Sequence, residues 1–224
     1  MTNYLIFILF PLLMGLFSQG LLKIRYKEAS GILAPLSGVM AARAILDSAG
    51  LTYVKIERIP GVMTDHYDPT CKTLRLSENS YNGRNLASVA IAAHEAGHAL
   101  QDAQRYKFMI IRQLAVPLAS FGGNTALLFI IVGFAINAMN LAVLGVIGFA
   151  LVAIFQILNL PVEYNASFRA RKQLSSLGFI SSDQMPIVDR MLNAAALTYV
   201  AGTLSAIFNF LYYALLIINN QQKK

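Results

Sequence analysis

Charged residues are scarce in this sequence. Asp, Glu, Lys and Arg make up 13% of the 224 residues, whereas hydrophobic residues make up 56%. Soluble domains are about 25% charged and about 45–50% apolar, so this composition excludes an ordinary soluble protein and predicts an integral membrane protein. The net charge of +7 is spread over several segments without a dense Lys/Arg run, which suits membrane topology and argues against a nucleic-acid partner.

Cysteine is limited to one residue, and internal repeats and low-complexity tracts are absent. Cys71 alone can form no disulfide within the chain, and it carries no information about the redox compartment. Because it has no partner nearby in sequence, we expect it to pack as a small side chain rather than to bind zinc.

Four stretches are long and apolar enough to cross a membrane as helices. They cover residues 4–22, 114–136, 141–160 and 197–218. No basic residue precedes the first stretch and no clear cleavage site follows it, so we interpret it as an uncleaved anchor rather than a signal peptide. Only 137–140 separate the two middle stretches, which must therefore form an antiparallel hairpin.

Basic residues set the expected orientation of the chain. Lys23, Arg25 and Lys27 directly follow the first apolar stretch, and further basic residues lie in 161–196. The positive-inside rule then places the polar segments 23–113 and 161–196 in the cytoplasm and both termini outside. The predicted protein crosses the membrane four times and has its two polar segments on one face of the bilayer.

The first polar segment predicts a small α+β structure. Ser37 can cap a helix that runs to about Ser48, with Gly50 as its stop. Residues 52–57 alternate as a half-buried strand does, and 72–77 resemble a returning strand. Together the two strands predict a β-hairpin or a three-stranded sheet.

The next predicted helix, 84–104, carries His94-Glu95-Ala96-Gly97-His98. A helix advances about 100° per residue, so the two histidines project from the same face one turn apart. Two imidazoles at this spacing can share one tetrahedral zinc ion, with Glu95 beside it to act on metal-bound water. Two unliganded histidines and a carboxylate would be costly to bury on so apolar a helix, which favours the metal site.

A catalytic zinc site usually has three protein ligands and one open position. The residues leave two candidates for the third ligand. His66, the remaining histidine, lies in a segment rich in turn formers. Glu163 is the best-placed carboxylate of 161–196, because Pro161 can begin a new helix and place this glutamate in its first turn.

Several short sequence motifs together resemble those of a known family. They are Thr64-Asp65-His66-Tyr67-Asp68-Pro69, Leu74-Arg75-Leu76-Ser77, the zinc motif, Leu160-Pro161-Val162-Glu163-Tyr164-Asn165-Ala166-Ser167 with Arg169, and Ala195-Ala196-Leu197-Thr198-Tyr199-Val200-Ala201. In this order they resemble the YugP-type membrane zinc metallopeptidases, which are distantly similar to the HtpX-type and CAAX-prenyl membrane endopeptidases. The resemblance implies a mainly α membrane protein of four transmembrane helices with a small cytoplasmic α+β gluzincin-like metallopeptidase domain. It also implies a bacterial plasma membrane, and the orientation set by the basic residues makes the active site face the cytoplasm.

We expect five consecutive segments. Residues 1–24 form an N-terminal transmembrane anchor, 25–113 the cytoplasmic catalytic part with the β-hairpin and the zinc helix, 114–160 a transmembrane hairpin, 161–196 a cytoplasmic helical segment with the third zinc ligand, and 197–224 the fourth transmembrane helix and a short tail. The transmembrane hairpin separates His98 from Glu163 in sequence but returns the chain to the same side of the membrane.

The resemblance implies that His94, His98 and Glu163 hold one Zn²⁺ per chain. The HtpX-type pattern has an aspartate four residues beyond its ligand glutamate, where this chain has Ser167. A serine accepts a histidine N–H more weakly than a carboxylate does. The polar candidates for contacts around the ligands are Ser167, Asn165 and Arg169.

The implied reaction is hydrolysis of peptide bonds. The location of the site near the inner membrane surface suggests membrane or membrane-proximal proteins as substrates. Zinc activates a bound water, and Glu95 as general base takes the water proton and passes it to the leaving amine. A further donor must stabilise the oxyanion, and we prefer Tyr199 over Arg169 and His66 for that role. The strand at 72–77 could offer an edge with which an extended substrate pairs.

Two other functions use the same zinc motif. A site-2-type intramembrane protease takes its third ligand from an aspartate in a Leu-Asp-Gly word within a later span, but here Leu46-Asp47 is followed by Ser48 and precedes the zinc helix. A non-enzymatic zinc-binding membrane scaffold or assembly factor would not need Glu95 beside the metal. The peptidase is therefore the favoured interpretation.

Overall fold

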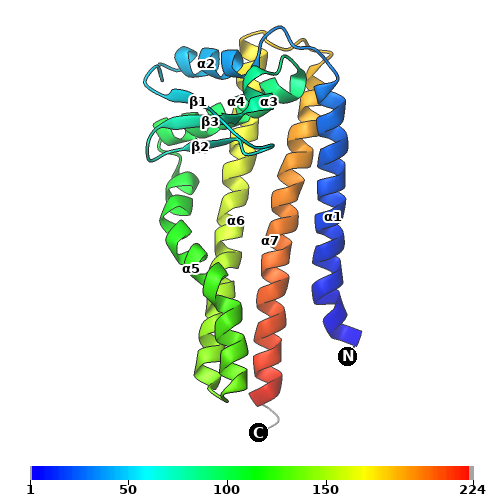
Figure 1. Ribbon diagram of the computed structural model, residues 1–224, viewed down its shortest axis with the longest axis vertical. Coiled ribbons are helices and arrows are strands. Elements are labelled where there is room, and N and C mark those ends of the chain that lie inside the picture. Colours follow the sequence, from blue (N-terminus) through cyan, green and yellow to red (C-terminus); the bar gives the residue numbers. More distant parts are fainter. Residues whose placement is uncertain (1, 222–224) are drawn as a thin grey trace. The chain divides into compact units, whose positions relative to one another are not determined.

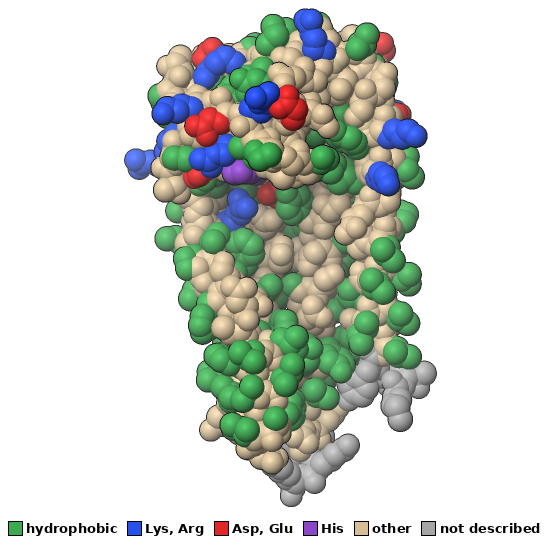
Figure 2. All heavy atoms as spheres, viewed as in Figure 1, with side chains coloured by type: hydrophobic (Ala, Val, Ile, Leu, Met, Phe, Trp, Pro, Cys, Tyr) green, Lys and Arg blue, Asp and Glu red, His purple; other side chains and the backbone are tan. Residues whose placement is uncertain are grey.

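The structure, a computed structural model, describes residues 2–221, which divide into two compact units (Figure 1). The helical unit comprises the described residues of 1–19, 111–160 and 197–224, and the mixed unit comprises 20–110 and 161–196. On the face drawn in Figure 2, charged side chains gather over the mixed unit, whereas the helical unit shows mainly hydrophobic side chains. This division follows the scarcity of charge in the apolar stretches.

Four long helices dominate the described chain. They are α1 (Thr2–Ser30), α5 (Lys107–Ala135), α6 (Met139–Ser176) and α7 (Met185–Gln221). All four are long and apolar enough to cross a membrane, so the predicted membrane helices are confirmed as candidates by length and composition. Each helix nevertheless extends beyond its apolar stretch. The apolar residues mark only the part of a helix that lipid can surround, whereas the helix itself continues as long as its backbone hydrogen bonds do.

The prediction that Pro161 begins a new helix is wrong. Pro161 lies inside α6, which continues through it to Ser176. Proline lacks an N–H and cannot bond the carbonyl of Ile157, but a long helix tolerates one missing bond when its flanking turns are well packed. Val162 and Ala166, just beyond the proline, have no exposed surface. Glu163 is therefore on the same continuous helix as the apolar stretch that precedes it.

Small residues let α5 and α6 pack closely within the helical unit. A Cβ added at Gly122 would lie 2.5 Å from the carbonyl oxygen of Gly148, and one at Gly145 would lie 2.4 Å from the carbonyl oxygen of Ala126. Such contacts are typical of helices that associate in a membrane through small side chains. Stacked rings of Phe149 on α6 and Tyr213 on α7, with centroids 4.9 Å apart, add a further helix contact.

A three-stranded sheet and three helices form the rest of the mixed unit. The strands are β1 (Lys55–Ile59), β2 (His66–Asp68) and β3 (Thr73–Ser77), and the helices are α2 (Gly38–Ser48), α3 (Glu78–Asn82) and α4 (Leu86–Ala103). The helix predicted after Ser37 is thus present, although the Ser37 side chain makes no capping hydrogen bond. Gly50 follows the helix with a φ of 74°, in the left-handed region that glycine adopts readily.

The three-stranded sheet, one of the two predicted alternatives, is confirmed, and its strand order is β1-β3-β2. β1 pairs with β3 in parallel, so these two strands do not form a hairpin; β2 supplies the antiparallel partner of β3. β3 is therefore central, with neighbours on both sides, and cannot be the free edge that was expected for a substrate. The sequence pattern did not predict the short β2, because turn-forming residues dominate that segment.

α4 forms the centre of the mixed unit. Its N-cap residue Asn85 accepts a hydrogen bond from the backbone N–H of Ser88 at 2.9 Å. Most of the helix is buried, and its core cluster includes Leu46 of α2 and Leu74 of β3, neither of which has any exposed surface. This burial agrees with the apolar sequence of the helix.

The C-terminal end of α4 is held to the sheet by polar contacts. Tyr67 on β2 donates a hydrogen bond to Asp102 at 2.7 Å, and Lys72 donates to the same carboxylate at 2.6 Å. Burial and the bond to Asp102 raise the pKa of Tyr67 above its usual value, so the phenol remains a donor. Cys71, expected to be packed, is exposed because it lies in the tight turn between β2 and β3.

Candidate metal centre

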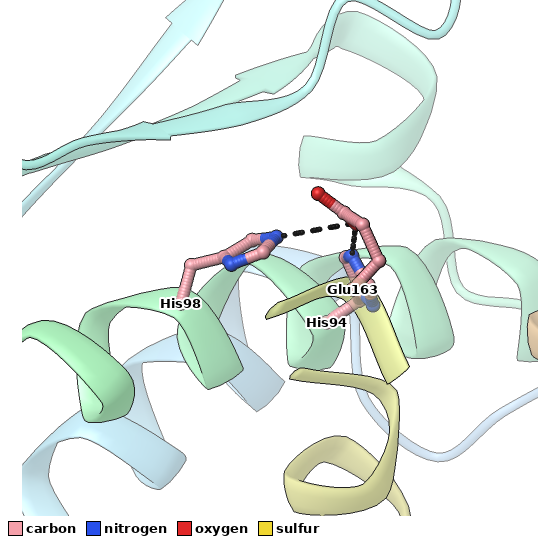
Figure 3. A group of neighbouring side chains, drawn as sticks. All are labelled: His94, His98 and Glu163. Atoms are coloured by element: carbon pink, nitrogen blue, oxygen red, sulfur yellow. Dashed lines mark hydrogen bonds and ion pairs between the residues drawn. The ribbon is translucent and has the colours of Figure 1, made fainter. Parts of the chain in front are cut away.

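Three side chains from two helices of the mixed unit converge on one point (Figure 3). His94 and His98 lie one turn apart on α4, and Glu163 comes from α6. One oxygen of Glu163, Oε2, is 3.2 Å from Nε2 of His94 and 3.6 Å from Nε2 of His98. Their candidate ligand atoms all lie within 4.8 Å of one another. The structure thus places Glu163 against both imidazoles, as the third-ligand hypothesis requires.

Gly97 permits this approach of α4 to α6. A Cβ at this position would lie 2.6 Å from the carbonyl oxygen of Ala166, and the other near atoms belong to the same backbone. A backbone carbonyl cannot rotate away as a flexible side chain can. Glycine inside the zinc motif therefore brings the two histidines of α4 within reach of the helix that carries Glu163.

The donor set fits a divalent cation such as Zn²⁺. Two imidazole nitrogens and one carboxylate are common zinc ligands, and three protein ligands leave a fourth position open. Glu163 is 3% exposed and His98 is 8% exposed, so these polar groups are largely withdrawn from water. Burial lowers the pKa of His98, but the hydrogen bond and charge of Glu163 outweigh burial and raise it. The negative charge of Glu163, which causes this rise, would also stabilise a cation bound between these side chains.

Glu95 lies between the two histidines in sequence and is itself buried. Burial raises the pKa of its carboxyl, the neighbouring imidazoles oppose that rise, and the carboxyls of Glu163 and Asp65 add to it. A carboxylate with a raised pKa is a stronger base than an exposed one, which is the property a proton acceptor needs.

Of the three polar residues expected around the ligands, Ser167 contacts a ligand histidine as expected, whereas Asn165 and Arg169 bond to other groups. Ser167 contacts a histidine directly, with its Oγ 3.1 Å from Nδ1 of His94. Asn165 contacts neither histidine; its Oδ1 accepts from Arg169 Nε at 2.7 Å and from Gln101 Nε2 at 3.0 Å. Sequence reasoning missed Gln101, whose Oε1 is 3.0 Å from Nδ1 of His98. Its position three residues after His98, on the same helix face, was the available signal.

The other candidate residues are outside the group of three converging side chains. His66 is exposed, and its Nδ1 is 2.8 Å from the backbone carbonyl of Thr64, so it is outside the group of three. Tyr199 is on α7 in the helical unit. Asp47, the aspartate of the site-2-type alternative, forms an ion pair with Arg43 on α2. Arg169 is engaged at both Asn165 and Gln104, with 2.6 Å between its Nη1 and Oε1 of Gln104.

Comparison with known proteins agrees with the zinc site that the geometry indicates. A family model described as "Putative neutral zinc metallopeptidase" matches residues 4–218. The chain is 40% identical over 187 residues to "Putative membrane protease YugP" of Bacillus subtilis (strain 168), and the alignment covers 84% of this chain and 83% of the relative. No solved structure matches the chain.

Proposed function

The chain belongs to the zinc metallopeptidase family whose model it matches, and we propose that it is a membrane-embedded zinc-dependent endopeptidase with a gluzincin-like site. One observation supports this proposal most: Glu163 reaches both histidines of the HExxH motif from a different helix. A fold that builds such a convergence, with Glu95 next to it, has the groups that hydrolysis of a peptide bond requires.

In this proposal each group has one role. His94, His98 and Glu163 hold one Zn²⁺ per chain, in line with their converging ligand atoms. When bound, zinc supplies Lewis acidity, which polarises the scissile carbonyl and acidifies water. Glu95 accepts a proton from the attacking water and delivers it to the leaving amine. Tyr199 is proposed as the donor to the oxyanion, on the basis of the sequence resemblance.

The two alternative functions are less well supported. The site-2-type mechanism needs an aspartate ligand from a later span, whereas Asp47 is on α2 and pairs with Arg43. A non-enzymatic zinc scaffold accounts for the ligands but leaves no use for a buried glutamate beside them. The matching family and the similar Bacillus protein are both described as peptidase or protease, which favours neither alternative.

Metal removal should abolish the proposed activity. We expect the full chain in detergent micelles to cleave a casein or peptide substrate, to lose that activity after dialysis against a chelator, and to regain it when stoichiometric Zn²⁺ is added. Cleavage would be followed by gel or fluorescence, and bound zinc by metal analysis. Cleavage that persists in protein shown to be free of metal would refute the zinc-dependent mechanism.

The proposed location is a bacterial plasma membrane, with the metal centre on the cytoplasmic side. The basic residues after the first apolar stretch support this orientation through the positive-inside rule. A centre at the inner surface suits substrates that are membrane proteins or membrane-proximal peptides. The single cysteine offers a direct test, because Cys71 is exposed and lies in the mixed unit.

We expect a membrane-impermeant maleimide to label Cys71 in inverted membrane vesicles but not in intact cells. As the matched reporter for the opposite side, Asn140→Cys in a Cys71→Ser background should label in intact cells, since Asn140 is exposed next to the turn between α5 and α6. The Cys71→Ser chain alone supplies the blank. Labelling of Cys71 in intact, unlysed cells would reverse the proposed orientation.

A further inference from the structure

The side chain of Gln101 is the largest polar group of the described chain that is fully buried, with no exposed surface. It lies on α4 three residues after His98. A buried primary amide is stable only when its carbonyl oxygen and its N–H groups find partners. In Gln101 the oxygen faces His98, and the nitrogen faces Val162 and Asn165 on α6.

These partners determine which way the amide points. The backbone carbonyl of Val162 can only accept a hydrogen bond, and it lies 2.8 Å from Nε2 of Gln101. The NH₂ group must therefore face α6, which leaves Oε1 facing Nδ1 of His98 at 3.0 Å. Because an amide oxygen can only accept, Nδ1 of His98 must carry a proton.

Asn165 and Arg169 reinforce this orientation. A guanidinium can only donate, so Nε of Arg169 obliges Asn165 to present its oxygen Oδ1 at 2.7 Å. The same oxygen lies 3.0 Å from Nε2 of Gln101 and can only accept from it. The direction of every bond from Arg169 to His98 is thus determined by groups that cannot exchange the roles of donor and acceptor.

His94 has no comparable partner. Its Nδ1 is 3.1 Å from Oγ of Ser167, and a hydroxyl can either donate or accept. Ser167 therefore does not select one tautomer of His94. The two histidines of the centre differ in this respect, although both direct Nε2 towards Oε2 of Glu163.

We propose that Gln101 is a positioning residue for the metal centre, which holds His98 as the Nδ1-protonated tautomer and keeps its Nε2 lone pair free for zinc. This inference rests on the proposed function, because it assumes that His94, His98 and Glu163 bind the metal. Partners of this kind, which orient a ligand histidine, commonly change metal affinity 10- to 100-fold when removed. Gln101 acts through His98 and need not touch the substrate.

The test compares zinc affinity in the full chain, measured in detergent by competition with a chromophoric chelator. We expect Gln101→Met, which keeps the volume but loses the acceptor, to weaken binding roughly 10- to 100-fold. Gln101→Glu keeps an acceptor for His98 and should restore most of the affinity. Gln19→Met is the matched control, because Gln19 is an exposed glutamine of α1, outside the chain of hydrogen bonds from Arg169 to His98; it should bind zinc as wild type does.

A role in packing alone predicts the opposite order. Gln101→Glu puts an unpaired carboxylate against the carbonyls of Val162 and Asn165, so it should destabilise the metal-free protein more than Gln101→Met does. The proposal would be overturned if Gln101→Glu bound zinc no more tightly than Gln101→Met. It would also be overturned if Gln101→Met bound zinc as tightly as wild type. The thermal midpoint of each metal-free variant shows whether it is folded.

A measurement on the wild-type chain tests the same proposal without relying on variants, which can fail to fold. In Co²⁺-loaded wild type, an imidazole bound through Nε2 gives a metal-shifted, exchangeable Nδ1–H proton resonance. We expect that of His98 to exchange slowly with solvent, since its partner Gln101 is fully buried. The absence of that resonance would overturn the inference. A wild-type chain that binds no stoichiometric zinc, or binds it equally well after Glu163→Ala, would instead contradict the proposed function.

Discussion

Glu95→Gln should reduce peptidase activity by roughly 10²- to 10⁴-fold while leaving zinc bound. The amide has the shape of the carboxylate but cannot accept the proton of the attacking water. Glu95 is outside the group of three candidate ligands, so its substitution should not release the metal. The measurement is kcat/KM on a peptide substrate, together with zinc content per chain, for the full protein in detergent.

Glu78→Gln makes a suitable control for this change. Glu78 is exposed on α3, where it pairs with Arg58 at 3.0 Å, so the same chemical substitution alters a surface charge only. We expect its kcat/KM and zinc content to equal those of wild type. Full activity in Glu95→Gln would remove the general base from the mechanism. A chain that binds zinc without any cleavage, with or without the substitution, would support the scaffold alternative.

Gly97→Ala should have the second large effect, on both stability and activity. The added methyl would lie 2.6 Å from the carbonyl oxygen of Ala166, so α4 and α6 must separate by roughly an ångström there. Overpacking of this kind costs about 1–3 kcal/mol of unfolding free energy. It also moves Glu163 away from the histidines, and a misplacement of about 1 Å can lower activity on the order of 10²-fold.

Gly20→Ala tests whether that effect comes from the contact rather than from the loss of a glycine. Gly20 is a helical glycine of α1 with no atom within 4 Å of an added Cβ. Alanine has the higher helix propensity, so this variant should be as stable as wild type or more stable by up to about 1 kcal/mol. Thermal unfolding, zinc content and kcat/KM of the two variants give the comparison. Equal behaviour of Gly97→Ala and wild type would mean that α4 and α6 do not approach as described.

Interactions between residues close together in the sequence determined much of the secondary structure of this protein. The apolar stretches predicted four long helices because lipid selects for composition over about twenty consecutive residues. The placement of His94 and His98 on one face followed from helical geometry alone. Gly50 marked the end of α2 through the local preference of glycine for the left-handed region. In each case the deciding interaction is made within a few residues of the chain.

Only the tertiary structure decided which distant groups meet. Local patterns left both His66 and Glu163 as candidates for the third ligand, and the family resemblance implied Glu163. Packing of α4 on α6, made possible by Gly97, places Glu163 beside the two histidines and leaves His66 exposed. The same packing buries Gln101 between the two helices, a contact that no motif marks. The central position of β3 is likewise a matter of strand pairing. Such contacts join residues that are far apart in the sequence, so they form only when the whole chain folds. A short window of neighbouring residues therefore does not predict them.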